Sequence, residues 1–343
     1  MPPTTPRQGL LAAGNFIVDH VKLIDAWPSQ DALVSILSEE SANGGGPYNL
    51  TKNLSRLFRD PEAAAFPLAA AGLVGDDADG RWILDDCAAH GIDTTHLRLS
   101  ENAPTSYTDV MTVASTGRRT FFHQRGANAL FDENGVDFAG VTARIFYLGY
   151  LLLLDALDAK RPDGQTGATI LLRRATAAGL TTVLDLVSEE SGRFREVLAP
   201  ALPEADVLLT NEFEASRLSG VDLESFTPET ARAAAAAILE LGVRRLVVIH
   251  APAGAVALER GGSTHTSGSV RVPEEEIKGA LGAGDAFAAG FLHGFHESKT
   301  LGDCLRLGAC VAASCLRHPT PSGGIPPLRE CVALGERWGF RDF

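Results

Sequence analysis

The segment GALGAGDAFAAG, residues 279–290, places one carboxylate directly behind a glycine-rich turn and ahead of an apolar run. This spacing predicts a turn followed by a helix that begins at about Asp285. The first backbone N–H groups of a helix have no partner inside the helix and lie at the positive end of its dipole. Gly282, Ala283 and Gly284 carry little or no side chain, so phosphate oxygens can approach these amides closely. The turn is therefore a candidate anion hole for a phosphoryl group in transfer.

Asp285 is the one ionisable side chain in this segment. A carboxylate at this point is placed to act as a general base, which takes the proton of a substrate hydroxyl as its oxygen attacks phosphorus. Aspartate after a glycine turn is also a common helix N-cap. The motif alone leaves both interpretations open.

The rest of the chain must supply elements that hold this turn. Short apolar runs alternate with amphipathic stretches, a pattern typical of βαβ units and a mostly parallel sheet. The expected strands lie within residues 143–151, 180–188, 205–212 and 244–251. The clearest helix follows Thr227, has Pro228 in its first turn and stops at Gly242.

Two pairs of segments alternate polar and apolar residues and do not follow the βαβ pattern. They are residues 20–28 with 33–41, and residues 105–113 with 118–124. We expect each pair to form a hairpin, and both hairpins to form a small sheet that covers a site as a lid. Disorder is expected over residues 1–8, where proline and threonine dominate. The expected α/β core comprises residues 9–18, 43–104 and 125–340, and the expected lid comprises residues 19–42 and 105–124.

Composition limits the partners of the chain. The 343 residues carry a formal net charge of -13 and no block of basic residues, which argues against a nucleic-acid surface. No apolar run is long enough to cross a bilayer, and the N-terminus lacks the pattern of a secretory signal, so we expect a cytoplasmic protein without a membrane partner. Five cysteines without a C-x-x-C motif are expected to be buried thiols: Cys87, Cys304, Cys310, Cys315 and Cys331.

Several segments together resemble one family in the same order along nearly the whole chain. GAGDAFAAGFLHG (282–294) is similar to the second signature of the PfkB, or ribokinase-like, family of carbohydrate and nucleoside kinases. GNFIVDHV (14–21) resembles the first strand of that family, whose terminal aspartate, here Asp19, binds substrate hydroxyls. A carboxylate that accepts two hydroxyls is well suited to read a sugar. GLVGDDADGRWILDDCAAHGID (72–93) resembles a structural segment of the family.

NGGGPYNLT (43–51) resembles the first signature of the family, a glycine pair followed by a substrate-contacting asparagine. The matching residues are Gly44, Gly45 and Asn49. Glycines let the backbone pass close to a ligand, and the asparagine offers both a donor and an acceptor. A helix N-cap is the alternative role for Asn49.

TNEFEA (210–215) resembles the N-x-x-E motif of the family, with Asn211 and Glu214 in the matching positions. The resemblance implies that this pair holds the assembly of Mg²⁺ and phosphate, with Glu214 acting through water, as expected of a cation that keeps several waters. The alternative is a helix cap followed by an exposed glutamate.

Two further segments resemble the lid return and the nucleotide loop of the family. TGRRTFFHQRGAN (116–128) ends at Asn128, which the resemblance implies as a substrate contact. IHAPAGAV (249–256) resembles the Gly-x-x-Gly segment on the adenine side, with Ala251 at the first glycine and Gly254 at the second.

The resemblance implies a three-layer α/β/α fold with a mostly parallel central sheet and a small β-sheet lid. It also implies a kinase that uses ATP and Mg²⁺ to phosphorylate a hydroxymethyl group of a sugar or related small molecule, with Asp285 as the base. Lid closure would exclude water and prevent hydrolysis of the nucleotide. If the lid exposes an apolar face or edge, a second copy of the chain can cover it, so we expect a homodimer.

The chain departs from the family pattern at several positions. Many sugar-specific members have asparagine where this chain has Ile17, which weakens a specific assignment to ribose. Many members also have Asp-Thr-Thr where residues 279–281 read Gly-Ala-Leu. Because that aspartate helps to bind a monovalent cation, activation by K⁺ is in doubt.

Two alternatives to a sugar kinase stay open. A nucleoside acceptor would call for aromatic stacking in the lid cleft, and the candidates Tyr107, Phe121 and Phe122 do not decide this. A catalytically silent sugar-binding relative would explain the altered residues described above, but an intact Asp285 argues against it.

Overall fold

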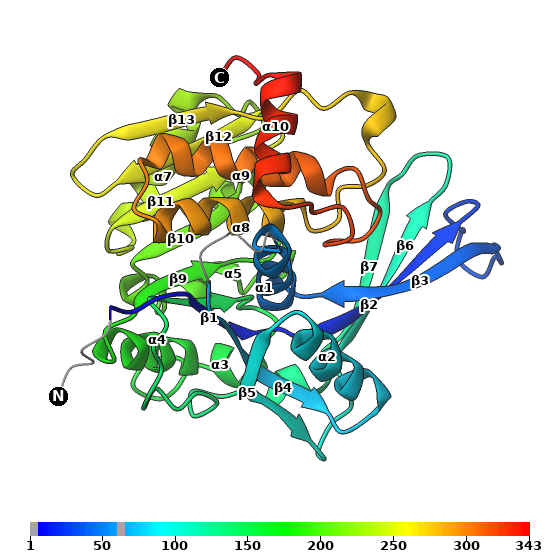
Figure 1. Ribbon diagram of the computed structural model, residues 1–343. Helices are drawn as coiled ribbons and strands as arrows, with labels where there is room; N and C mark the ends of the chain where they lie inside the picture. Colours follow the sequence, from blue (N-terminus) through cyan, green and yellow to red (C-terminus); the bar gives the residue numbers. More distant parts are fainter. Residues whose placement is uncertain (1–5, 60–65) are drawn as a thin grey trace.

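A nine-stranded sheet forms the centre of the computed structural model, which describes residues 6–59 and 66–343. Neighbouring strands are parallel except where β12 pairs with β11 and β13. In spatial order the strands are β13 (Thr264–Gly268), β12 (Gly254–Glu259), β11 (Leu246–His250), β10 (Val207–Asn211), β9 (Thr181–Asp185), β8 (Ile145–Gly149), β1 (Leu10–Gly14), β4 (Leu68–Gly75) and β5 (Ile92–Ser100) (Figure 1). The mostly parallel sheet predicted from the alternating pattern is confirmed.

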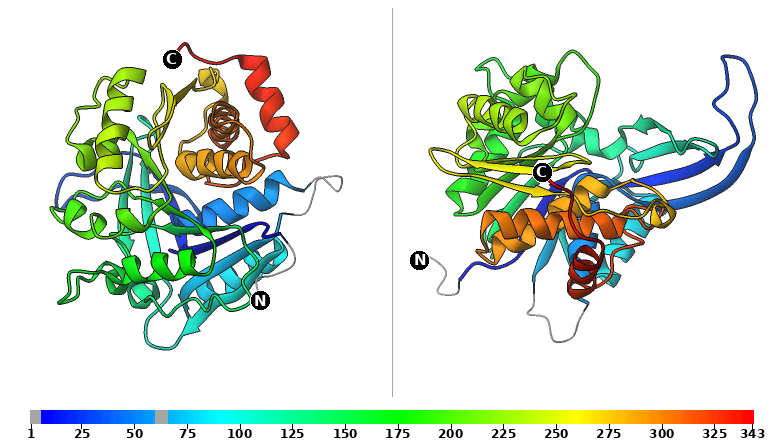
Figure 2. Two further views of the ribbon diagram at one scale, coloured as in Figure 1. Left: turned by 90° about the vertical axis from the view of Figure 1, so that its left-hand side faces the viewer. Right: turned by 90° about the horizontal axis from the view of Figure 1, so that it is seen from above.

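The central strands are continuous apolar runs because helices cover both of their faces. All five residues of β1 (LLAAG) and all five of β8 (IFYLG) are buried. The right-hand view of Figure 2 shows the strands between the two helical layers. One layer contains α1 (Gly46–Leu57), α2 (Ala78–Ala89), α8 (Ala283–His296), α9 (Leu301–Cys315) and α10 (Leu328–Trp338). The other contains α3 (Asp155–Asp158), α4 (Gly167–Ala177), α5 (Phe194–Leu198), α6 (Glu212–Ser219) and α7 (Pro228–Glu240).

Two helix starts show how far local sequence decides a boundary. α7 begins at Pro228 behind the N-cap Thr227, as its sequence predicts, and Thr227 also forms a capping box with Thr230. α8 begins at Ala283, earlier than the predicted start at about Asp285, and its N-cap is Gly282 in the left-handed conformation. The interpretation of Asp285 as an N-cap is therefore wrong, because this residue lies inside the first helical turn.

A second sheet of four strands projects from the body of the molecule at one edge (Figure 1). Its spatial order is β3 (Ile36–Gly44), β2 (Ile17–Ile24), β6 (Tyr107–Val113) and β7 (Arg119–Gln124). The pairs β2–β3 and β6–β7 are antiparallel, and β2 and β6 run parallel to each other. β2 begins at Ile17 and β3 ends at Gly44, inside the segments that the sequence assigned to the core.

Other expectations concern single residues and the ends of the chain. All five cysteines are buried and free, as predicted. Most of the expected disordered segment 1–8 falls on residues 1–5, which lie outside the described residues, as do residues 60–65. Within the described part of the chain, no helix has the length and apolar character needed to span a membrane.

Candidate active site

The predicted site residues gather where the carboxyl ends of the central strands meet the root of the small sheet. Asp19 lies in β2, Gly44 ends β3, Asn211 ends β10, and Asp285 lies in the first turn of α8. In open α/β sheets this edge is where ligands bind. The fold therefore brings together residues that are far apart in the sequence.

Asp285 is held by two neutral donors. Its side chain is only 5% exposed. Asn49 Nδ2 donates a hydrogen bond of 2.8 Å to Oδ2, and the hydroxyl of Tyr150 donates to Oδ1. Burial raises the pKa of Asp285 to about 6, while the hydrogen bonds from Tyr150 and Asn49 act to lower it. The carboxylate is thus ionised at neutral pH and a stronger base than an exposed aspartate, which suits general base catalysis.

The turn before Asp285 presents bare backbone at the start of α8, where the Ala283 amide donates to the carbonyl of Ala280 at 3.3 Å. Gly282 has φ 72° and makes no side-chain capping hydrogen bond to the first turn of α8. A Cβ on Gly282 would lie 2.6 Å from Cβ of Pro321, and a Cβ on Gly284 would lie 3.2 Å from Cε1 of His250. Only glycine fits at the first position, and the second has little space. The turn has the conformation and the bare backbone expected of an anion hole.

Asp19 rests on the backbone of Gly44. A Cβ on Gly44 would fall 2.4 Å from Oδ1 of Asp19, so this position admits no side chain. Asp19 is 6% exposed, and burial together with the charge of Asp285 raises the pKa of Asp19 well above its usual range. Gly45 has φ 86°, and a Cβ there would lie 2.3 Å from the carbonyl oxygen of Asn15. Asp19 and Asp285 are therefore close enough for the charge of Asp285 to act on Asp19.

Asn49 serves Asp285 and not the start of α1. That helix begins at Gly46 with Gly45 as its N-cap, so the interpretation of Asn49 as an N-cap is wrong. Its Oδ1 accepts a hydrogen bond of 2.6 Å from Asn43 Nδ2, which also donates to Ser322 Oγ at 3.0 Å. The amide of Asn49 is thereby oriented with its Nδ2 toward the carboxylate.

Asn211 and Glu214 form a capping box at the start of α6. The helix cap that the sequence offered as an alternative is present, but the exposed glutamate of that alternative is not, because Glu214 is only 3% exposed. Oε1 accepts from Ser188 Oγ and Asn211 Nδ2, both at 2.9 Å. Oε2 accepts from Thr210 Oγ1 at 3.1 Å and from the Asn211 amide at 3.0 Å. With both oxygens engaged, Glu214 can act on a metal ion only through water.

Asn128 and Gly254 are both closely packed by neighbouring groups. Asn128 is fully buried. Its backbone N–H donates to Ser106 Oγ at 3.1 Å, and its side-chain Oδ1 has no partner among the described residues. None of the hydrogen bonds described connects Asn128 to Asp285. A Cβ on Gly254 would lie 2.7 Å from the ring of Phe343, which gives this glycine a packing role. Next to it, the ring of His250 at the end of β11 lies against Gly284 and Phe287.

Three residues at this edge were missed by the sequence analysis. Tyr150 bonds to Asp285 as described above. Tyr147 donates a hydrogen bond of 2.6 Å to Oδ2 of Asp185, which ends β9 and is 7% exposed. Burial, followed by the charge of Asp285, raises the pKa of Asp185 well above its usual range. A tyrosine inside an apolar run, and an aspartate at the end of one, are the signals that could have found them, since buried hydroxyls need a partner.

A comparison with protein families decides the classification. The model of the pfkB family of carbohydrate kinases matches residues 12–327. The chain belongs to this family. The predicted ribokinase-like fold is confirmed, and membership in this family makes the chain a phosphotransferase with an alcohol group as acceptor.

Individual relatives agree with this classification. A ribokinase from Arabidopsis thaliana is 26% identical over 332 residues, which cover 94% of this chain and 78% of the relative. The structure of Arabidopsis thaliana ribokinase complexed with ribose and ATP has a TM-score of 0.78 at 23% identity and covers 96% of this chain and 98% of its own. A nucleoside kinase from Burkholderia thailandensis in complex with inosine has a TM-score of 0.71 at 17% identity, covering 97% and 98% of the two chains.

Proposed function

We propose that this pfkB-family kinase transfers the γ-phosphoryl group of ATP to a hydroxymethyl group of a sugar or sugar-like small molecule. The observation that carries the proposal is the position of Asp285. A buried carboxylate with a raised pKa lies in the first helical turn behind a glycine-rich stretch that admits no side chain at Gly282. Base and anion hole are thus adjacent on one backbone segment.

In the proposed reaction, Asp285 accepts the proton of the acceptor hydroxyl. The oxygen of that hydroxyl attacks the γ-phosphorus, the new P–O bond forms, and the bond to the leaving ADP oxygen breaks. Charge develops on the transferred phosphoryl group, and the backbone amides of Gly282 and Gly284 with the dipole of α8 stabilise it. After transfer, Asp285 releases its proton to solvent.

The groups around Asp285 have distinct proposed tasks. No described residue donates a hydrogen bond to the carboxylate of Asp19, so this group is free to accept hydroxyls of the acceptor. Gly44 would leave room for the Asp19 side chain, and Gly45 for the Asn15 carbonyl, beside the acceptor. Gly254, at the start of β12, would contact the nucleotide. Residues 19–42 and 105–124 would close over the site as a lid and exclude water.

Mg²⁺ fits this site in an outer-sphere role. The described residues contain no group of three or more His, Cys, Asp or Glu side chains that could hold a metal ion directly. Glu214 and Asn211 would position it through water, as Mg²⁺ often keeps several waters when it binds phosphates. Bound with the nucleotide, the ion would neutralise phosphate charge. Residues 279–281 offer no carboxylate, so we do not propose a monovalent cation.

A homodimer through the lid is part of the proposal. The lid exposes large apolar side chains that a second copy would cover: Trp27, Leu33, Ile36, Leu37, Phe121 and Phe122. Light scattering after size exclusion is expected to give a mass of two chains. A concentration-independent monomer mass would contradict this part.

The test of the function is ADP formation with ATP and Mg²⁺ against a panel of pentoses, hexoses, keto-deoxy sugar acids and nucleosides. We expect turnover with one sugar class. Turnover with nucleosides alone would favour the nucleoside kinase that the inosine complex of a relative suggests. If no acceptor raised turnover while one of them raised the melting temperature, a silent sugar-binding protein would replace the kinase.

A further inference from the structure

Tyr150 lies immediately after β8, at the carboxyl edge of the sheet, and its hydroxyl reaches across to α8. It donates a hydrogen bond to Oδ1 of Asp285, while Asn49 donates to Oδ2. The pKa of Tyr150 is raised well above its usual range by burial and by the charge of Asp285, so the hydroxyl keeps its proton. Each oxygen of the proposed base is thus already bonded to one neutral donor.

The ring of Tyr150 occupies space that α1 leaves open. A Cβ on Gly46, the first residue of α1, would lie 2.7 Å from Cε1 and Cζ of Tyr150 and 2.9 Å from the hydroxyl of Tyr147. A side chain at position 46 would push the ring aside. The absence of one lets Tyr150 lie between the first turns of α1 and α8.

The backbone around Tyr150 is fixed from three directions. Its amide N–H donates to Oδ1 of Asn15, which follows β1. Leu152 has φ 80°, an unfavourable left-handed conformation for a leucine. Asp158 accepts a hydrogen bond of 3.0 Å from the Leu152 amide, and Arg125, at the root of the lid, donates to the Leu152 carbonyl at 2.9 Å. The strained conformation persists because the surrounding groups hold it.

No cation compensates Asp285 within the described part of the chain. The ionised form of Asp285 raises the pKa of the Asp19 and Asp185 carboxyls and of the Cys315 thiol. The two groups that bond to Asp285 are uncharged donors, which favour that form. Loss of either donor should therefore change how readily Asp285 takes up a proton.

We propose that Tyr150 is a positioning residue for the base: its hydroxyl holds Asp285 in its ionised form and leaves a defined direction for the acceptor hydroxyl. A carboxylate has about four lone-pair positions. Tyr150 and Asn49 take one on each oxygen, so the acceptor must bond to one of those that remain. This inference rests on the proposed kinase reaction.

The first test compares pH profiles of kcat for the wild type, Tyr150→Phe and Tyr147→Phe. Asp285 acts when ionised, so activity is present above its pKa and lost below it. The Tyr150 hydroxyl lowers the pKa of Asp285, so its removal should raise that pKa. The acidic limb of the profile should therefore move to higher pH by about one unit or more. At pH values below the new pKa, kcat should fall by about tenfold to a hundredfold relative to the wild type. Tyr147→Phe removes a hydroxyl that bonds to Asp185 instead, and its limb should stay with that of the wild type.

The second test uses Gly46→Ala alone and combined with Tyr150→Phe. Alone, it should shift the acidic limb in the same direction by displacing the ring. In the Tyr150→Phe background it should add nothing to that shift, because the hydroxyl contact is already gone. An unmoved limb in Tyr150→Phe, or a further shift in the double variant, would overturn the inference.

A third measurement separates this inference from the proposed function. A ¹³C NMR titration of the aspartate carboxyls, with Asp285 assigned by its loss in Asp285→Asn, needs no substrate and reports the pKa in the folded protein. A higher pKa of Asp285 in Tyr150→Phe supports the inference even if no acceptor is turned over. An unchanged pKa overturns it even if the wild type is an active kinase.

Discussion

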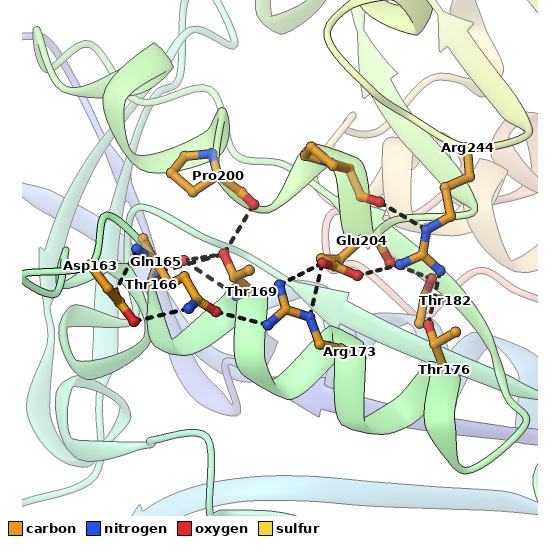
Figure 3. Close-up of polar contacts among 11 residues, drawn as sticks. Asp163, Gln165, Thr166, Thr169, Arg173, Thr176, Thr182, Pro200, Glu204 and Arg244 are labelled. Atoms are coloured by element: carbon orange, nitrogen blue, oxygen red, sulfur yellow. Dashed lines mark hydrogen bonds and ion pairs between the residues drawn. The ribbon is translucent and has the colours of Figure 1, made fainter.

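The acidic side chains at the two ends of the central strands have different partners. Near the amino ends of β9, β10 and β11, Glu204 and Asp206 lie close to arginines. At the carboxyl edge of the sheet, the buried acidic groups are hydrogen-bonded to neutral donors. Figure 3 shows part of the first arrangement. Glu204 accepts from Arg173 at 2.8 Å and forms an ion pair with Arg244. Asp206 accepts from the Thr182 amide at 2.9 Å and lies 3.7 Å from Arg244.

The carboxyl ends carry three acidic groups without a salt bridge among the described residues. Asp185 accepts from a tyrosine hydroxyl and a backbone amide. Glu214 accepts from hydroxyl and amide groups, and Asp285 accepts from Tyr150 and Asn49. Burial raises the pKa of each of the three.

The difference separates stability from function. Arginines at the amino ends satisfy the charge of their acidic partners and tie α4 to the strands that follow it. At the carboxyl ends, burial raises the pKa of acidic groups that form no salt bridge within the described part of the chain, an arrangement typical of active sites. Substitutions at the amino ends should therefore lower stability, and substitutions at the carboxyl ends should lower turnover.

A large effect on turnover is expected from Gly282→Ala, with Gly242→Ala as its matched control. Both glycines have positive φ, and a Cβ on either would meet a proline: Pro321 at 2.6 Å for Gly282 and Pro203 at 2.8 Å for Gly242. Both variants should lose stability. Only Gly282→Ala distorts the anion hole, so it alone should lower kcat, by about 10²- to 10³-fold. Equal losses of kcat in the two variants would show that the effect of Gly282→Ala comes from general destabilisation and not from the anion hole.

The next effect is a pH-dependent gain of stability in Asp285→Asn. Burial raises the pKa of Asp285 from 3.8 to about 6 in the folded state, so the stability linked to this group is present below pH 3.8 and lost as pH rises through 6. At pH 8 the variant should be more stable than the wild type by up to about 3 kcal/mol, and at low pH the gain should vanish.

Urea unfolding of both proteins between pH 4 and 8 measures this difference. Glu204→Gln is the control from the other end, where it breaks bonds to two arginines and should lower stability at pH 8. If Asp285→Asn were less stable than the wild type at pH 8, the ionised carboxylate of Asp285 would not lower the free energy of unfolding, and the prediction would be wrong.

The smallest effect is expected from the arginines of the amino end. Arg244 donates to the Pro203 carbonyl at 2.8 Å and to Thr176 Oγ1 at 3.1 Å in addition to its ion pairs, so Arg244→Ala should lower the free energy of unfolding by about 2 kcal/mol. The Arg173 side chain is 54% exposed, and Arg173→Ala should cost at most about 1 kcal/mol. Neither should change kcat/KM. A loss of kcat/KM in either variant would show that the arginines near the amino ends of the strands also affect catalysis, and would contradict the separation of stability from function.

Much of the fold is readable in the sequence because burial on both faces makes the central strands continuous apolar runs. β8, β9, β10 and β11 all lie inside segments predicted as strands. The signature segments also place Asp285, Asn49 and Asp19 near one another. These positions are predictable because each belongs to a short motif with its own local signal.

The contacts that complete the site were not predictable, since they join segments far apart in the chain. Tyr150 and Asp285 are separated by 135 residues, and Asn43 and Ser322 by 279. Local signals also misled. Aspartate is a favoured N-cap, yet Gly282 caps α8. Glutamate in a first turn is usually exposed, yet Ser188 and Thr210 enclose Glu214.

The most direct test of the central claim is phosphoryl transfer itself. Wild-type protein and Asp285→Asn are each incubated with [γ-³²P]ATP, Mg²⁺ and the acceptor that gives turnover, and the label in acceptor and in inorganic phosphate is counted. We expect label in the acceptor with the wild type and a loss of about 10²- to 10⁴-fold with the variant, whose fold is retained. Transfer by Asp285→Asn at the wild-type rate, or label that appears only in inorganic phosphate, would contradict it.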